Sequence, residues 1–135
     1  MRRVLLAVAW GLGYVWALPL TILGVLQALV GGARPLAWDR GVWYWTARQS
    51  GICAWFFRRY RMAAYTWGAV ITWADPVLAT SRRLRLHERR HVWQCMVLGP
   101  LIVPAYLVCL ACYGYQRNPL EVDARAHEMD PGPQP

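Results

Sequence analysis

The first thirty residues after the basic start of the chain carry no charge. Met1, Arg2 and Arg3 are followed by an uncharged run from Val4 to Ala33. A helix needs about 20 apolar residues to cross the hydrocarbon core of a membrane. The run therefore predicts an apolar N-terminal helix, and Pro19 with Gly24 indicates a kink or a helix pair. A cleaved signal peptide is the alternative, but its apolar region is typically only about 7–15 residues long, so an uncleaved anchor is favoured.

A second uncharged segment, Pro100 to Tyr115, lies near the C-terminus and contains Pro100 and Pro104. Its length fits a membrane span, a buried core helix or a re-entrant helix, and the pattern leaves all three open. The chain thus has one or two candidate spans.

Between these segments the pattern is mixed. Val42–Thr46 and Ile52–Phe57 are short aromatic and β-branched runs that fit either a strand or an interfacial helix. Residues Ala64–Trp73 are rich in β-branched and aromatic side chains and predict one strand, with Gly68 marking a bulge or a close backbone approach.

A longer helix is expected to follow and to end at Gly99-Pro100, because glycine and then proline are typical after a helix C-terminus. Asp75, Thr80 and Ser81 compete as its N-cap. Asn118 starts a short C-terminal helix that is expected to run to about Glu128. The predicted class is an α+β membrane protein with an apolar N-terminal helix or helix pair, short strands, a central helix, a second apolar helix and a short C-terminal helix.

The composition supports a membrane partner. Apolar residues make up 57% of the 135-residue chain, charged residues make up 16%, and nine residues are Trp. The formal net charge is +8, and every basic residue is Arg. These values exclude a disordered or acidic chain, and Trp together with Arg is typical of lipid headgroup depth. Arg58, Arg59 and Arg61 beside aromatic residues predict a membrane-surface patch, whereas no nucleic-acid-binding module is present and no nucleic acid is expected as a partner.

The candidate chemistry lies in the sequence His87-Glu88-Arg89-Arg90-His91. Residues four apart on a helix share one face, so the two imidazoles can hold one Zn²⁺. Glu88 lies beside the first ligand and can act as the general base for a water molecule. The alternative is an exposed basic helix whose histidines are only surface groups.

Zinc needs a third protein ligand, and the candidates downstream are Glu121, Asp123, His127 and Glu128. Glu121 is favoured, because a turn at Gly99-Pro100 and the apolar helix can bring the chain back antiparallel. Two other roles stay open: Glu121 can close a capping box on Asn118, and Asp123 can hold the N–H of a ligand histidine from outside.

These motifs resemble those of known families. His87-Glu88-x-x-His91 with a later Glu resembles the gluzincin class of zinc metallopeptidases. The segments LPLTILG, TWGAVITW, HERRHVWQ, LGPLIVPAYL and NPLEVDA together resemble a family of small, functionally uncharacterised bacterial membrane proteins. The resemblance implies a zincin-like architecture with His87, His91 and Glu121 as ligands and Glu88 as base.

Two features of the resemblance leave the surroundings of the ligands open. Gln94 lies one turn beyond His91 and is, with Asp123, a candidate for a residue that contacts a ligand from behind; its detailed role is not assigned. Arg125 stands where many gluzincins place an Asp that orients a histidine, so Asp123 would have to act from another helical face.

The expected function is an integral-membrane zinc metallopeptidase of the bacterial inner membrane, which hydrolyses peptide bonds by metal-activated water. Its expected partners are the lipid bilayer and a peptide or protein substrate, which the strand at 64–73 can bind by strand addition. The alternative is a non-catalytic zincin-like membrane adaptor or scaffold. The expected organisation is a membrane segment at 1–33, a zincin-like domain at 34–130 that includes the apolar helix 100–115, and a disordered tail at 131–135.

The side of the membrane that holds the site stays open. Eleven Arg between residues 34 and 91 favour the cytoplasmic side for that region, whereas Arg2 and Arg3 favour a cytoplasmic N-terminus and the opposite placement.

Overall fold

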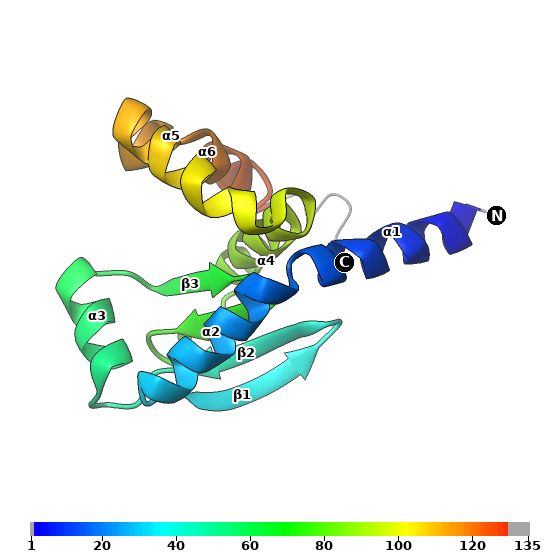
Figure 1. The fold of residues 1–135 in the computed structure, drawn as a ribbon. Helices are drawn as coiled ribbons and strands as arrows, with labels where there is room; N and C mark the ends of the chain where they lie inside the picture. Colours follow the sequence, from blue (N-terminus) through cyan, green and yellow to red (C-terminus); the bar gives the residue numbers. More distant parts are fainter. Residues whose placement is uncertain (1, 130–135) are drawn as a thin grey trace.

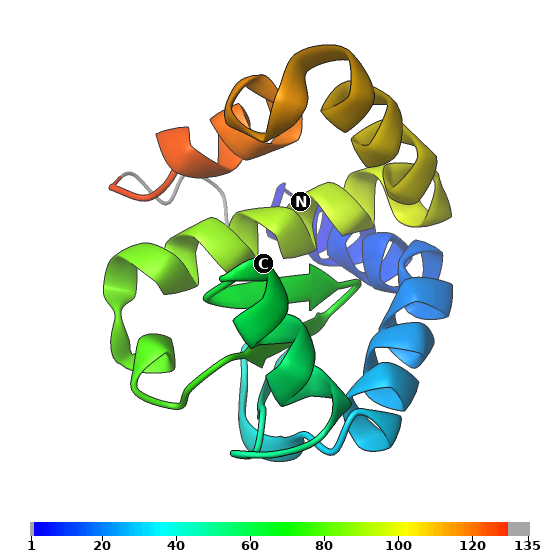
Figure 2. The same ribbon diagram turned by 90° about the vertical axis from the view of Figure 1, so that its left-hand side faces the viewer.

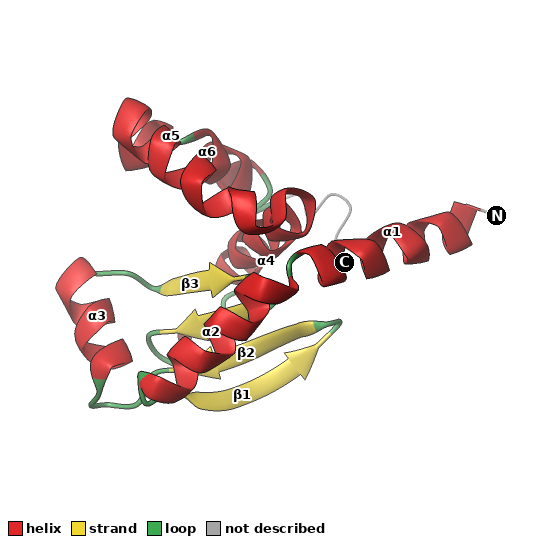
Figure 3. Cartoon of the chain, in the orientation of Figure 1, coloured by secondary structure: helices red, strands yellow, loops and turns green. Residues whose placement is uncertain are grey.

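A computed structural model describes residues 2–129 and has a mixed α+β fold around one four-stranded sheet (Figure 1; Figure 3). The strands are β1 (Arg34–Asp39), β2 (Val42–Thr46), β3 (Ala64–Trp67) and β4 (Val70–Trp73). The helices are α1 (Arg2–Trp16), α2 (Leu18–Val30), α3 (Ile52–Tyr60), α4 (Arg82–Leu98), α5 (Ile102–Arg117) and α6 (Pro119–Ala126), with short 3-10 turns at Leu78–Thr80 and Gly99–Leu101.

The sheet has the order β1-β2-β4-β3. The β1–β2 and β3–β4 pairs are antiparallel, and β2 and β4 are parallel. Helix α3 lies between the two hairpins in the chain and supplies the connection that the parallel pair requires. As a result β3 forms one edge of the sheet, beside α4.

The expectation of a single strand over Ala64–Trp73 is wrong. Trp67 pairs with Val70, so Gly68 and Ala69 form a two-residue hairpin loop. Gly68 has a φ of 58°, a conformation that glycine adopts without steric cost and that tight hairpin loops require. Both halves of the hairpin are β-branched and aromatic, which is why the composition alone did not separate them.

The other undecided segments are now assigned. Val42–Thr46 is strand β2, whereas Ile52–Phe57 lies in helix α3. Strand β1 at Arg34–Asp39 was not expected, because its alternation is interrupted by Pro35 and by a register shift between Pro35 and Ala37. The predicted tail at 131–135 lies outside the described residues.

Helices cover both faces of the sheet. Alternate residues of a strand point to opposite faces. Ile71 and Trp73 of β4 belong to a core cluster with Val92 of α4, and Val70 belongs to a second cluster with Ala28 of α2. Helix α4 therefore packs on one face, and α2 with α3 packs on the other.

The N-terminal segment is a helix pair, as the sequence predicted. Helices α1 and α2 are broken at Ala17 and bent by 57°, with Pro19 in the first turn of α2. Leu20 and Ala28 of α2 are buried in the two core clusters, so this segment is part of the folded body. By length and composition, one stretch, Arg82–Arg117, is long enough to cross a membrane, and the bent pair is a second if it counts as one span.

The ends of α4 follow local sequence signals. Ser81, rather than Asp75 or Thr80, is the N-cap, and its Oγ accepts from the backbone N–H of Leu84. The helix ends at Leu98 as predicted, because Gly99 adopts a φ of 54°. A side chain at Gly99 would collide with the indole of Trp16 in α1.

The chain then returns over α4. Gly114 interrupts α5 with a φ of 70° and a ψ of 169°, and Asn118 caps α6 by accepting from the N–H of Leu120. Helix α6 packs on α4 (Figure 2) and ends at Ala126, two residues before the predicted Glu128. This return places the C-terminal acidic residues above the histidine motif.

The contact between α2 and the sheet gives a first test. A Cβ at Gly24 would lie 2.9 Å from Cβ of Trp67 and 3.0 Å from Cβ of Val70. Gly24→Ala should therefore lower the free energy of unfolding by about 1–3 kcal/mol, as other overpacked cores do. Gly11→Ala is the control, because a Cβ at Gly11 meets nothing within 4 Å. Thermal unfolding of the full chain in detergent measures both, and equal stability of the two variants would contradict the packing.

Candidate metal centre

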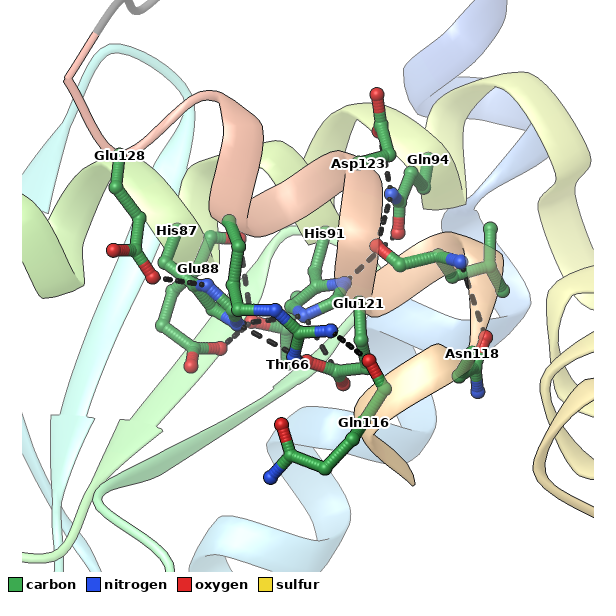
Figure 4. A network of polar contacts seen from close by, with 12 residues as sticks. Thr66, His87, Glu88, His91, Gln94, Gln116, Asn118, Glu121, Asp123 and Glu128 are labelled. Carbon is green, nitrogen blue, oxygen red and sulfur yellow. Dashed lines mark hydrogen bonds and ion pairs between the residues drawn. The ribbon is translucent and has the colours of Figure 1, made fainter. Parts of the chain in front are cut away.

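Three side chains converge on one point between α4 and α6. Nε2 of His87 lies 3.2 Å from Nε2 of His91. The carboxylate oxygens of Glu121 lie 3.4 Å from Nε2 of His87 and 3.5 Å from Nε2 of His91. The sequence prediction that both rings face a common point is confirmed, and the ligand atoms of the three residues all lie within 4.8 Å of one another (Figure 4).

These separations fit a small tetrahedral cation. Ligand atoms at about 2.1 Å from a tetrahedral ion lie about 3.4 Å from each other. The three observed separations are close to this value. In addition, Oε2 of Glu121 is buried and makes no hydrogen bond within the described part of the chain. Two imidazoles and one carboxylate are a common donor set for catalytic zinc, so His87, His91 and Glu121 could hold a metal ion.

Gln94 fixes the orientation of His91. The side-chain N–H₂ of Gln94 donates to the carbonyl of Leu120 and to Oδ2 of Asp123, and both of these groups only accept. The amide oxygen of Gln94 therefore faces Nδ1 of His91, at 2.8 Å. Nδ1 carries the hydrogen of that contact, and Nε2 is left with a lone pair that points to the centre.

Glu128 does the same for His87. Its Oε1 lies 3.1 Å from Nδ1 of His87, and its other carboxylate oxygen pairs with Arg83. A carboxylate accepts the Nδ1–H, so Nε2 of His87 also presents a lone pair to the centre. Glu128, one of the candidate ligands from the sequence, thus contacts the outer nitrogen of His87 and not the centre itself.

Asp123 acts one step further from the centre than expected. The sequence left open a direct contact of Asp123 with the N–H of a ligand histidine; in the structure Asp123 binds Gln94 and makes a two-point ion pair with Arg90, at 2.7 and 3.0 Å. Burial raises the pKa of Asp123, but the hydrogen bond from Arg90 is the main opposing influence and the net pKa is lowered. The reason for the difference is the helical face: Asp123 lies two residues after Glu121 on α6 and contacts Arg90 of α4, and Gln94 lies between Asp123 and His91.

Glu121 faces the centre and not its own helix end. Asn118 caps α6 through Leu120, and Oε1 of Glu121 accepts from the hydroxyl of Tyr106 at 2.8 Å. Burial raises the pKa of Glu121, but the two imidazoles and the Tyr106 hydroxyl outweigh burial and hold the pKa well below its usual range. The imidazoles lower the pKa of Glu121 only while they present an N–H to it; when those protons leave, a metal ion can take their place between the three side chains.

Glu88 lies beside the triad on the side of the sheet edge. It is buried, and its Oε2 accepts from the hydroxyl of Thr66 in β3 at 2.7 Å. This hydrogen bond holds one carboxylate oxygen and so sets the direction of the other. Nothing in the spacing of the motif indicates Thr66, because the contact joins residues 22 positions apart.

A cavity of about 480 Å³ opens next to these groups. His87, Glu88, His91 and Glu121 line one part of it. Its apolar walls come from β3 and the helices α2, α3 and α5, and include Leu20, Phe56, Trp67, Ile102, Val103 and Leu107. The site is thus reached from a largely apolar space between the sheet edge and α5.

The arginines of the motif have structural partners. Arg89 binds the hydroxyl of Tyr44 and the carboxylate of Asp39, and the guanidinium of Arg90 lies 3.8 Å from the ring centre of Trp93. Neither is among the described residues that line the cavity. Tyr106 and Tyr115 line it instead, and Tyr106 lies in the segment LGPLIVPAYL, which carried part of the resemblance.

Comparison of the chain with protein-family models, with curated proteins and with solved structures gives no match. The likeness to gluzincins therefore stays a prediction, and the chemistry has to be inferred from the geometry.

Glu121 gives the sharpest test of the metal centre. Glu121→Gln replaces an anionic ligand by a neutral amide, so zinc affinity should fall more than about 100-fold, beyond the loss that follows removal of an outer partner. Glu88→Gln is the matched control and should keep zinc, because Glu88 is not in the triad. Zinc per chain is measured by elemental analysis after dialysis. Equal zinc in Glu121→Gln and the wild type would show that Glu121 is not a ligand.

Gln94 tests the orientation of His91. Gln94→Met keeps the length of the side chain and removes the acceptor for Nδ1–H, so zinc affinity should fall about 10–100-fold. Competition with a zinc chelator measures the change. An unaltered affinity would mean that His91 is oriented by packing alone.

Proposed function

We propose that the protein is a zinc-dependent metallopeptidase of a membrane. The observation that carries the proposal is the convergence of His87, His91 and Glu121, with buried Glu88 on the same cavity. Two imidazoles, one carboxylate and an adjacent second carboxylate are the donor set and base that metal-assisted hydrolysis requires.

Each residue of the site has a separate role in hydrolysis. Zinc, when bound, supplies a Lewis acid that polarises a carbonyl and lowers the pKa of water. Glu88 takes the proton of the attacking water and returns it to the leaving amine. Thr66 holds Glu88 in place, and Gln94 and Glu128 keep both imidazoles in the tautomer that presents Nε2.

A peptide fits this site better than a compact substrate. Strand β3 is an edge of the sheet and lines the cavity from Ala64 to Trp67. An edge strand presents unpaired backbone groups, to which an extended peptide adds as a further strand. The apolar walls of the cavity then receive apolar side chains of that peptide.

Exposed apolar side chains support the placement of the protein in a membrane. Helices α2 and α5 expose large apolar side chains that no part of the described chain covers: Ile22, Leu23, Leu26, Leu29, Val30, Leu107 and Val108. Within Arg82–Arg117, the apolar stretch of 18 residues is only 22% buried, whereas the core helix of a soluble protein is mostly buried. Large apolar side chains exposed along two helices are typical of a lipid-facing protein.

The test is hydrolysis of a peptide library by the zinc-loaded full chain in detergent. Glu88→Gln should lower turnover by about 10²–10⁴-fold, the usual contribution of general acid–base catalysis, while the zinc content stays unchanged. Zinc-loaded wild-type protein that cleaves no peptide would overturn the proposal and favour a zincin-like adaptor. Equal activity of the wild type and Glu88→Gln would show that Glu88 is not the base.

A further inference from the structure

A second depression lies away from the metal centre, between the start of β1, the loop after β2, helix α3 and the segment that follows β4. It has a volume of about 710 Å³, and three arginines line it: Arg34 at the start of β1, Arg48 in the loop after β2, and Arg58 on α3. The residues of the metal triad are not part of its lining. Three exposed arginines from three separate segments of the chain therefore line one depression.

These charges are poorly neutralised by the protein. Asp75 is the acidic residue in the lining, and its Oδ1 accepts from the backbone N–H of Val77. Within residues 2–129, the side chains of Arg34 and Arg48 make no hydrogen bond or ion pair, and the side chain of Arg58 donates to the carbonyl of Gln49. The contrast with α4 is informative, because Arg83, Arg85 and Arg90 there all have carboxylate partners.

The chemistry of the depression favours a phosphate group. Guanidinium groups bind phosphate through two parallel N–H···O bonds, and several of them around one space match its charge and its oxygens. A carboxylate has only two oxygens and would form this pair of bonds with one guanidinium group only.

The position of the depression points to a phosphate held at a membrane surface. The exposed apolar face of α2 runs from Ile22 to Val30, and Arg34 follows four residues later. Helix α3 exposes Ile52 and Trp55 beside Arg58. Trp and Arg next to the end of an apolar helix are typical of headgroup depth, where the phosphates of lipids lie.

We infer that Arg34, Arg48 and Arg58 bind the phosphate of an anionic glycerophospholipid, whose acyl chains lie along the exposed face of α2. The inference rests on the membrane placement proposed above and is independent of the metallopeptidase activity. It gives the Arg-rich surface a defined role, which is to anchor the end of α2 and the β2–α3 loop at the headgroups of one leaflet.

The test counts lipids retained by the full chain in detergent, by native mass spectrometry during titration with phosphatidylglycerol. The double variant Arg34→Gln/Arg48→Gln should bind this lipid about tenfold more weakly, because two charge-assisted contacts are lost. The matched control is Arg82→Gln/Arg117→Gln, which removes the same charge from exposed arginines outside the depression and should bind as the wild type does.

Three results would overturn the inference: an equal loss in both double variants, equal retention of phosphatidylcholine, or displacement of phosphatidylglycerol by millimolar inorganic phosphate, which would identify a site for soluble phosphate. Whether the full chain stays in solution without detergent is a separate measurement. It tests the membrane placement, whereas the difference between the two double variants tests the depression.

Discussion

The structure depends on two imidazole lone pairs and one carboxylate that face each other across a few ångströms. The acceptors at Nδ1 of His87 and His91 leave both Nε2 atoms with lone pairs directed inward, 3.2 Å apart. The anionic Glu121 closes the third side. Buried groups of this kind are costly unless a partner compensates them, and a cation is the partner that satisfies all three at once.

The rest of the fold serves this arrangement. Helix α4 carries both histidines and Glu88, and the sheet supports it from one face. The break at Gly114 and the cap at Asn118 return α6 over α4. The ion pair Arg90–Asp123 joins the two helices, and Arg83–Glu128 joins α4 to the segment after α6. The same arginines that give the chain its basic character thus hold the outer partners of the ligands in place.

The sequence predicted what local spacing determines. The i, i+4 spacing of His87 and His91, the stop at Gly99-Pro100 and the start of α6 at Asn118 were correct, because each depends on a few neighbouring residues. Glu121 was favoured as the third ligand because a turn at Gly99-Pro100 and the apolar helix could bring the chain back antiparallel, with a capping role as the alternative. The hairpin at Gly68 was missed, because both of its strands share one composition. Thr66, Tyr106 and the role of Glu128 could not be predicted, because they depend on contacts between distant segments. Gln94 was a candidate partner of a ligand because it lies one turn from His91, but its bonds to Leu120 and Asp123 also join distant segments.

X-ray absorption spectroscopy at the zinc edge tests the centre most directly. The full chain loaded with one equivalent of zinc should show only nitrogen and oxygen neighbours at about 2.0–2.2 Å, with the outer scattering of two imidazole rings. The chain also contains four cysteines, which compete for zinc in any misassigned site. A sulfur neighbour at about 2.3 Å, or a first shell without imidazole, would contradict the centre formed by His87, His91 and Glu121.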